Sequence, residues 1–173
     1  MISANFSVGL LTVSLLLIAM VGCGSTEVDP PNPEASSESA IDRRSYDLGI
    51  IGAFSEMVGV GVKKMALSAT LTPEAADALE EEAEKIARRN GALTYRERDF
   101  LVTDLFPASV TEGLDVLVIY KDNTLEDYLA LKGEKQALIA EGRYQGAARR
   151  DIARKMGLLL SYPDAKIDEM LAE

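Results

Sequence analysis

The sequence predicts a helix-rich α+β fold, in which a small, mainly antiparallel sheet of two or three strands packs against about five helices. Apolar residues recur at three- and four-residue steps over most of residues 46–173, which is typical of helices with one buried face. After Gly91 the spacing changes to alternation, and DVLVIYK at 115–121 is almost continuously apolar. We therefore expect one globular domain over 46–173 that contains both kinds of element.

The first helix is expected over residues 46–68, with Ser45 as its N-cap. Glycine destabilises a helix interior by roughly 1 kcal/mol relative to alanine, so a helix that keeps several needs a reason. The glycines predict either a close approach of another backbone or a break near Gly59. They are Gly49, Gly52, Gly59 and Gly61.

The second helix has local signals at both ends. Thr72 is a suitable N-cap, Pro73 fits the first turn, and Asn90-Gly91 ends the helix. Its expected buried stripe consists of small and aliphatic residues: Ala75, Ala76, Leu79, Ala83, Ile86 and Ala87.

Two strands follow, within 92–102 and at 115–121. The connection between them, 103–113, contains Pro107 and Gly113 and leaves no room for a crossover helix. We therefore expect antiparallel pairing, with the more apolar 115–121 in the centre of the sheet.

The sequence after residue 121 predicts three helices. The first should begin with a capping box of Thr124 and Asp127 and continue to Gly142. The other two are expected over about 148–160 and 167–171. The expected buried residues of the first of these helices are Leu125, Tyr128, Leu129, Leu138 and Ile139.

Composition excludes several classes of function. The chain has no histidine and only one cysteine, so Ser-His-Asp triads, Cys/His zinc sites and intramolecular disulfides are impossible. No nucleotide motif is present, and we expect neither a cofactor nor a metal site. The formal net charge of −10 argues against nucleic acid as a partner, because phosphates are bound through Lys and Arg.

The single cysteine follows an apolar run at 8–21, which is too short to span a bilayer as a helix. The quartet Met20-Val21-Gly22-Cys23 resembles the lipobox of bacterial lipoprotein precursors. The resemblance covers residues 1–23. It implies that the signal peptide 1–22 is removed and that Cys23 carries lipid. The mature protein would then be anchored in the cell membrane or outer membrane, facing away from the cytoplasm.

Residues 23–45 are expected to form the lipidated terminus and a spacer. The segment behind Cys23 is rich in Pro, Ser and Glu and has too little apolar surface to form a core.

Two groups of residues are candidates for a site. Asp99, Asp104, Glu112 and Tyr120 lie on or beside the predicted sheet. Asp99 and Asp104 could converge as an acid/base pair or as a pair of oxygen ligands. They could equally be strand-edge and turn residues. Arg143, Arg150 and Arg154 could present a basic surface to anionic lipid head groups, cell-wall phosphates or an acidic partner, or pair with neighbouring carboxylates.

We therefore expect a monomeric, membrane-anchored domain that binds a protein partner or a small ligand at the cell envelope and has no catalytic activity. The alternative is an envelope hydrolase that uses paired carboxylates, such as Asp99 and Asp104, on a glycan-like substrate.

Overall fold

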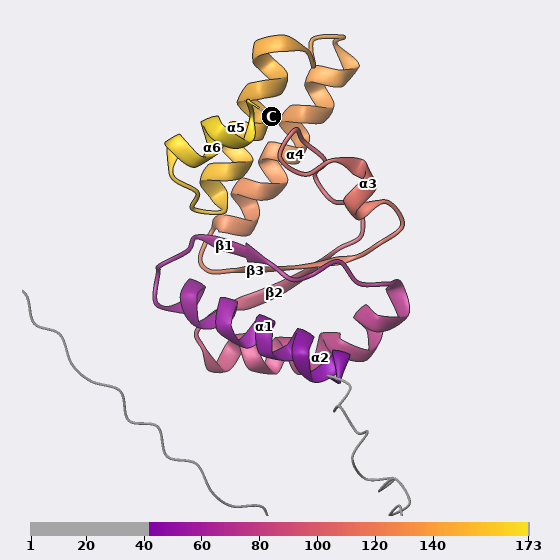
Figure 1. Cartoon of the computed structure of the whole chain (residues 1–173), viewed down its shortest axis with the longest axis vertical. Coiled ribbons are helices and arrows are strands. Elements are labelled where there is room, and N and C mark those ends of the chain that lie inside the picture. The colour runs from indigo at the N-terminus through magenta and orange to yellow at the C-terminus, as the bar shows by residue number, and fades with distance from the viewer. Residues whose placement is uncertain (1–41, 173) are drawn as a thin grey trace, which may run out of the picture. The chain divides into compact units, whose positions relative to one another are not determined.

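The computed structural model describes residues 42–172 and confirms the helix-rich α+β fold (Figure 1). The predicted signal peptide, Cys23 and most of the predicted spacer lie outside the described residues. The elements in chain order are α1 (Arg43–Gly59), β1 (Met65–Leu67), α2 (Pro73–Arg89), β2 (Leu93–Glu97), α3 (Ala108–Thr111), β3 (Val116–Tyr120), α4 (Thr124–Ala140), α5 (Gly146–Leu159) and α6 (Asp164–Met170).

The sheet has the order β1-β3-β2, and both pairings are antiparallel. Met65 of β1 and Leu93 of β2 both pair with Tyr120, from opposite sides of β3. The predicted central position of the apolar strand and its antiparallel pairing with the preceding strand are confirmed.

Helices cover both faces of the sheet. Figure 1 shows α1 and α2 on one face and α4, α5 and α6 on the other. Alternate residues of β3 divide between the two layers: Leu117 and Ile119 pack with α1 and α2, whereas Val116 and Val118 pack with α4 and α5. β3 is thus buried from both sides, which explains its continuous apolar sequence.

Helix α2 follows its predicted signals closely. The Thr72 side chain accepts a hydrogen bond from the Ala75 N–H, Pro73 occupies the first turn, and Asn90 is the C-cap. The buried residues come from the predicted stripe: Ala76, Leu79, Ala83 and Ala87.

The first predicted helix was wrong at both ends. Helix α1 begins at Arg43, because the Asp42 side chain, and not Ser45, caps the first turn by accepting bonds from Arg44 N and Ser45 N. Three residues assigned to the spacer therefore belong to the helix. At the other end, Gly59 closes α1, and residues that were expected to continue it form β1.

The close approach that the glycines predicted occurs at Gly59. A Cβ placed there would lie 1.7 Å from the carbonyl oxygen of Asn90, so the backbones of α1 and α2 touch at this point. Gly49 has nothing within 4 Å, and Gly52 makes only an ordinary contact. The prediction is therefore confirmed at one position, which is also where the helix ends.

Helix α4 differs from expectation in its cap and its buried face. Asn123 is the N-cap, and no side chain makes a capping hydrogen bond, so the predicted Thr124–Asp127 capping box was wrong. Tyr128 and Leu131 are buried where the helix packs on the sheet, whereas Leu129 and Ile139 are exposed to nearly half of their surface. The far half of α4 extends beyond the sheet and contacts mainly α5.

Candidate ligand-binding cavity

A cavity of about 600 Å³ lies along β1, at the edge of the sheet, and residues from both helical layers contribute to its lining. Five separate segments line it: one residue of α1, the chain from Lys63 through β1 to Thr70, the connection between β2 and β3, the first residue of β3, and the turn between α5 and α6. The residues are Phe54, Lys63, Ala66, Leu67, Ser68, Ala69, Thr70, Phe100, Phe106, Val110, Thr111, Val116, Leu160 and Tyr162.

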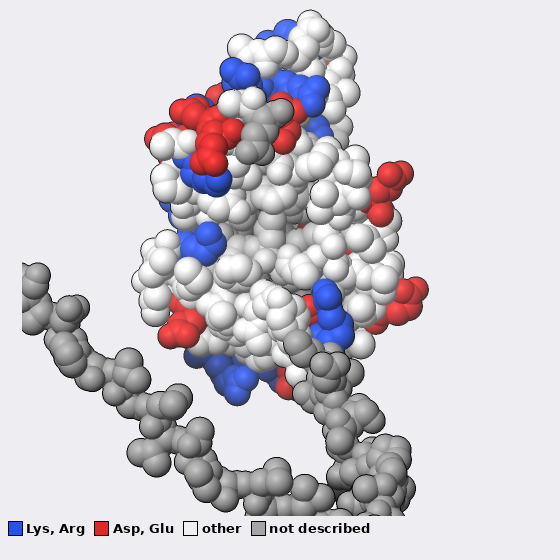
Figure 2. All heavy atoms as spheres, viewed as in Figure 1, with Lys and Arg blue, Asp and Glu red and all other residues white. Residues whose placement is uncertain are grey.

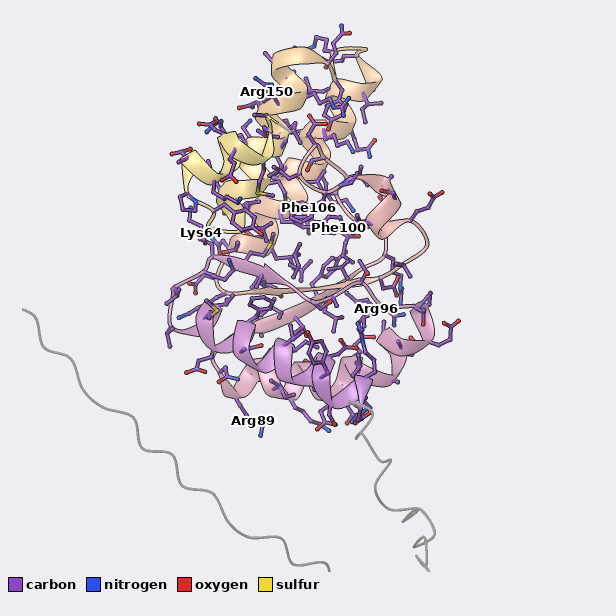
Figure 3. The ribbon with its side chains drawn as sticks, viewed as in Figure 1. Lys64, Arg89, Arg96, Phe100, Phe106 and Arg150 are labelled. Carbon is purple, nitrogen blue, oxygen red and sulfur yellow. The ribbon has the colours of Figure 1, made fainter. Side chains whose placement is uncertain are left out.

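Aromatic rings form one wall of this cavity. Phe100 and Phe106 meet edge to face, with ring centroids 5.8 Å apart, and Phe100 also stacks at a tilt on Tyr128. Figure 3 shows the two phenylalanines between the sheet and the upper helices. Such edge-to-face pairs favour a fixed ring arrangement, so this wall is preformed.

Helix α4 holds that aromatic wall in place through two lysines. Lys132 donates to the carbonyl oxygen of Asp99 and to Oε2 of Glu97, and Lys135 donates to the carbonyl oxygen of Val102 at 2.7 Å. Burial lowers the pKa of Lys135. Phe100 lies between these two anchor points, so the backbone on either side of it is fixed to α4.

The opposite wall is the strand β1 and its continuation, which bends beside the cavity. Ser68 N and Leu71 N donate to Leu117 O and Asp115 O of the neighbouring chain segment. Between these two bonds, Ala69 and Thr70 lie opposite the single residue Val116. Two residues opposite one is the pattern of a β-bulge. The Ser68 hydroxyl accepts from Leu117 N and donates to Ala69 O, so its hydrogen-bonding capacity is used within the wall.

The turn between α5 and α6 is fastened to the start of β1 at the margin of the cavity. Lys63 Nζ donates to Leu160 O at 2.7 Å and lies 5.4 Å from the centroid of the Tyr162 ring. Lys64 N donates to the Ser161 hydroxyl at 2.8 Å. Ser161 has a φ of 62°, an unusual conformation for a non-glycine residue. Its hydroxyl is the group that binds the residue before β1.

The chemical character of the lining favours binding. Among the described residues that line the cavity, Lys63 alone is charged, and no carboxylate is present. Figure 2 shows the same character at the surface: the middle of this face is mostly uncharged, and acidic and basic side chains gather above and below it. An apolar pocket with few polar groups is the usual form of a small-ligand site.

The predicted acid/base residues lie outside this cavity. Asp99 is 88% exposed at its side chain and lies 3.5 Å from Lys132 of α4, whereas Asp104 pairs with Arg149 of α5. Glu112 is exposed directly after α3, and Tyr120 packs against the core on the α4 and α5 face. The two aspartates therefore have separate cationic partners.

The predicted basic residues contact mainly neighbouring carboxylates. Arg143 pairs with Glu141, and Arg154 joins α5 to α6 through Asp164 and Asp168. Arg150 is exposed and lines a second hollow, of about 610 Å³, together with Asp104 and Arg149. Of the three, Arg150 remains a candidate for an external contact, and Arg154 has a structural role between two helices.

Sequence reasoning did not find the cavity residues. Lys63, Phe100, Phe106 and Tyr162 come from segments with no common period, and only the topology brings them together. The one available signal was the presence of Phe100 and Phe106 close together, at the end of the predicted strand 92–102 and in the connection that follows it.

The chain matches no family model, no curated protein and no solved structure. Within residues 42–172, no helix is long and apolar enough to cross a bilayer, and no cluster of three or more acidic or sulfur side chains is arranged for a metal ion. The class defined by the structure is thus a three-layer α+β domain with an apolar cavity at the edge of its sheet.

Proposed function

We propose that this chain is a bacterial envelope lipoprotein whose domain, residues 42–172, binds a small, mainly apolar ligand in the cavity along β1. The anchoring half of the proposal rests on the lipobox-like quartet that ends at Cys23. The binding half rests on the cavity, whose volume of about 600 Å³ lies within the range of small-molecule sites.

The observation that carries the binding proposal is the composition of the cavity wall. Phe54, Leu67, Phe100, Phe106 and Val110 offer apolar surface, and the hydroxyl of Ser68 is already occupied by backbone groups. Burying apolar surface of a ligand here is favourable, because little polar surface of the protein must lose water without compensation. A pair of catalytic carboxylates, by contrast, would have to face the ligand, and the described lining of this cavity contains none.

Binding can be measured with the neutral fluorescent probe aminoanthracene. The chain from residue 23 onward, with Cys23→Ser to remove competing acyl groups, contains both core clusters and the whole sheet. We expect saturable binding that Ala69→Phe, which fills the cavity from the β1 side, abolishes. Ala53→Phe is the matched control, because Ala53 is exposed on α1 and does not line the cavity. Equal binding by both variants would reject the site.

The anchor is tested on the full chain expressed in a bacterium. Mass spectrometry of the N-terminal peptide should find a chain that begins at Cys23 with diacylglycerol on its sulfur. Cys23→Ala should remove radiolabelled palmitate and release the domain from the membrane fraction. A native chain that retains residues 1–22, or begins at residue 23 with a free thiol, would disprove the anchoring.

A further inference from the structure

The single charge in the cavity wall indicates what kind of ligand fits. We infer that the cavity binds a single-chain amphiphile with a terminal carboxylate, of the fatty-acid class, with its chain against Phe100 and Phe106 and its carboxylate on Lys63 Nζ. This inference rests on the proposed function and names the ligand class for the same cavity.

Lys63 is held in place at the margin of the cavity. Its ammonium donates to Leu160 O at 2.7 Å and lies over the Tyr162 ring, and the side chain is partly buried. A lysine ammonium has three donors, and this bond uses one of them. Further donors are therefore available to an anionic group, and the position of the nitrogen is fixed before the ligand arrives.

The charge of Lys63 is not balanced by the protein. Some cations elsewhere in the domain, such as Lys132 and Arg149, pair with carboxylates, whereas Lys135, like Lys63, donates to a backbone carbonyl oxygen. Within residues 42–172, no carboxylate forms an ion pair with Lys63, although the chain carries a net charge of −10. A ligand carboxylate would supply the missing counter-charge in a partly desolvated position, where a charge-assisted hydrogen bond is strongest.

The remaining wall suits an acyl chain. Apart from Lys63, the lining consists of aliphatic and aromatic side chains and of hydroxyls, and these offer no second charge for a doubly charged or zwitterionic ligand. A neutral apolar molecule would leave the ammonium unpaired. A carboxylate attached to one hydrocarbon chain satisfies both parts of the wall.

The test uses fatty acids from octanoate to palmitate and the alcohol of each chain length, titrated into the chain from residue 23 with Cys23→Ser and followed by displacement of aminoanthracene. We expect the Kd of the acids to fall about threefold to fourfold per added methylene until the cavity is filled. Each acid should bind about tenfold or more tightly than its alcohol.

Two lysine variants isolate the carboxylate contact. Lys63→Met should bring the Kd of each acid to that of its alcohol, with aminoanthracene displacement calibrated by the probe's own Kd for this variant. A cooperative urea unfolding transition shows that the variant is folded. Lys64→Met is the matched control. It removes the same charge from the next residue, and Lys64 is exposed and does not line this cavity. It should keep the preference for acids. Lys63→Arg should restore much of that preference.

Several results would overturn the inference. Equal affinity for acids and alcohols, or an equal loss in Lys63→Met and Lys64→Met, would show that Lys63 does not select the ligand, while retained aminoanthracene binding would leave the proposed function intact. Failure of aminoanthracene and of every acid to bind would reject both proposals.

Discussion

The hydroxyl of Tyr128, on α4, donates a hydrogen bond of 2.9 Å to Oε2 of Glu97, on β2, and both residues are buried. Lys132 donates to the same carboxylate oxygen, and Asp99 N donates to the other. The phenol oxygen in turn accepts a bond from Leu101 N. This network fixes the start of the segment that forms the aromatic wall of the cavity.

Tyr128→Phe should destabilise the domain by about 1–3 kcal/mol, because Glu97 loses a donor and Leu101 N loses its acceptor, both in buried positions. Urea unfolding measures the change. Tyr46→Phe is the control, since Tyr46 is half exposed, and it should change the free energy of unfolding by less than about 0.5 kcal/mol. A Tyr128 effect no larger than that of Tyr46 would show that the network does not contribute to stability.

Stability should also fall at alkaline pH. Burial, together with the nearby Glu97 carboxylate, raises the pKa of Tyr128 above its ordinary value of 10.0. Above pH 10.0 the unfolded chain loses this proton while the folded chain keeps it, so the free energy of unfolding decreases as pH rises. Below that pH the contribution is fully present.

Unfolding at about pH 8 and about pH 11 tests this linkage. Other groups titrate in the same range, but subtracting the Tyr128→Phe curve from that of the unmodified chain isolates the phenol. The unmodified chain should lose more stability between the two conditions. An equal loss of stability in the unmodified chain and in Tyr128→Phe would mean that folding does not raise the pKa of Tyr128.

Arg96 is expected to be essential for stability. Its side chain is 6% exposed, and it binds the buried carboxylate of Asp115 at 2.6 Å. It also binds Asp77, Glu80 and the carbonyl oxygen of Pro73, so it joins β2 to the start of α2 and to the residue before β3. The carboxylates, Asp77 first, raise the pKa of Arg96.

Arg96→Met should cost about 3–5 kcal/mol, because Asp115 would be left as a buried, unpaired carboxylate. Arg98→Met changes an exposed arginine two residues away and should change stability by less than about 0.5 kcal/mol. Thermal and urea unfolding of the Arg96→Met and Arg98→Met variants measure both changes in stability. Similar midpoints would disprove a structural role for Arg96.

The two glycines Gly59 and Gly49 should respond in opposite directions to alanine. Gly59→Ala places a methyl group against the Asn90 backbone, which cannot move without displacing α2, and should cost about 3 kcal/mol or more. Gly49→Ala fills open space on an exposed helix face and should stabilise by about 1 kcal/mol. Equal shifts in the melting temperature would contradict the close contact.

Elements whose signals are local were predictable from the sequence. Thr72, Pro73 and Asn90 define α2 within one segment, and the structure places the cap and the ends where they were expected. β3 was equally clear, because a short run that is apolar at every position and rich in β-branched residues is typical of a strand buried on both faces.

β1 was not predictable in the same way. Met65 and Ala66 are both buried although they face opposite layers, so the strand lacks alternation, and the spacing of Val62 and Met65 also fits a helix. The turn after Gly59 depends on the contact with Asn90, which is remote in sequence. The spacing of apolar residues within one segment gives no information about a contact with a residue that is remote in sequence.

The site was less predictable than the fold. Asp99 and Asp104 were chosen for their chemical type, but their positions relative to Lys132 and Arg149 depend on how α4 and α5 pack. The cavity depends on the same packing, since its wall combines α1, β1, the β2–β3 connection and the end of α5. Residue type alone could not locate it.

The order β1-β3-β2 has a consequence for synthesis on the ribosome. The middle strand is the last of the three to emerge, and its neighbours cannot hydrogen-bond to each other across the gap that it fills. A nascent chain that stops before Val116 therefore holds two unpaired strands with exposed edges, and sheet formation waits for the second half of the translated domain.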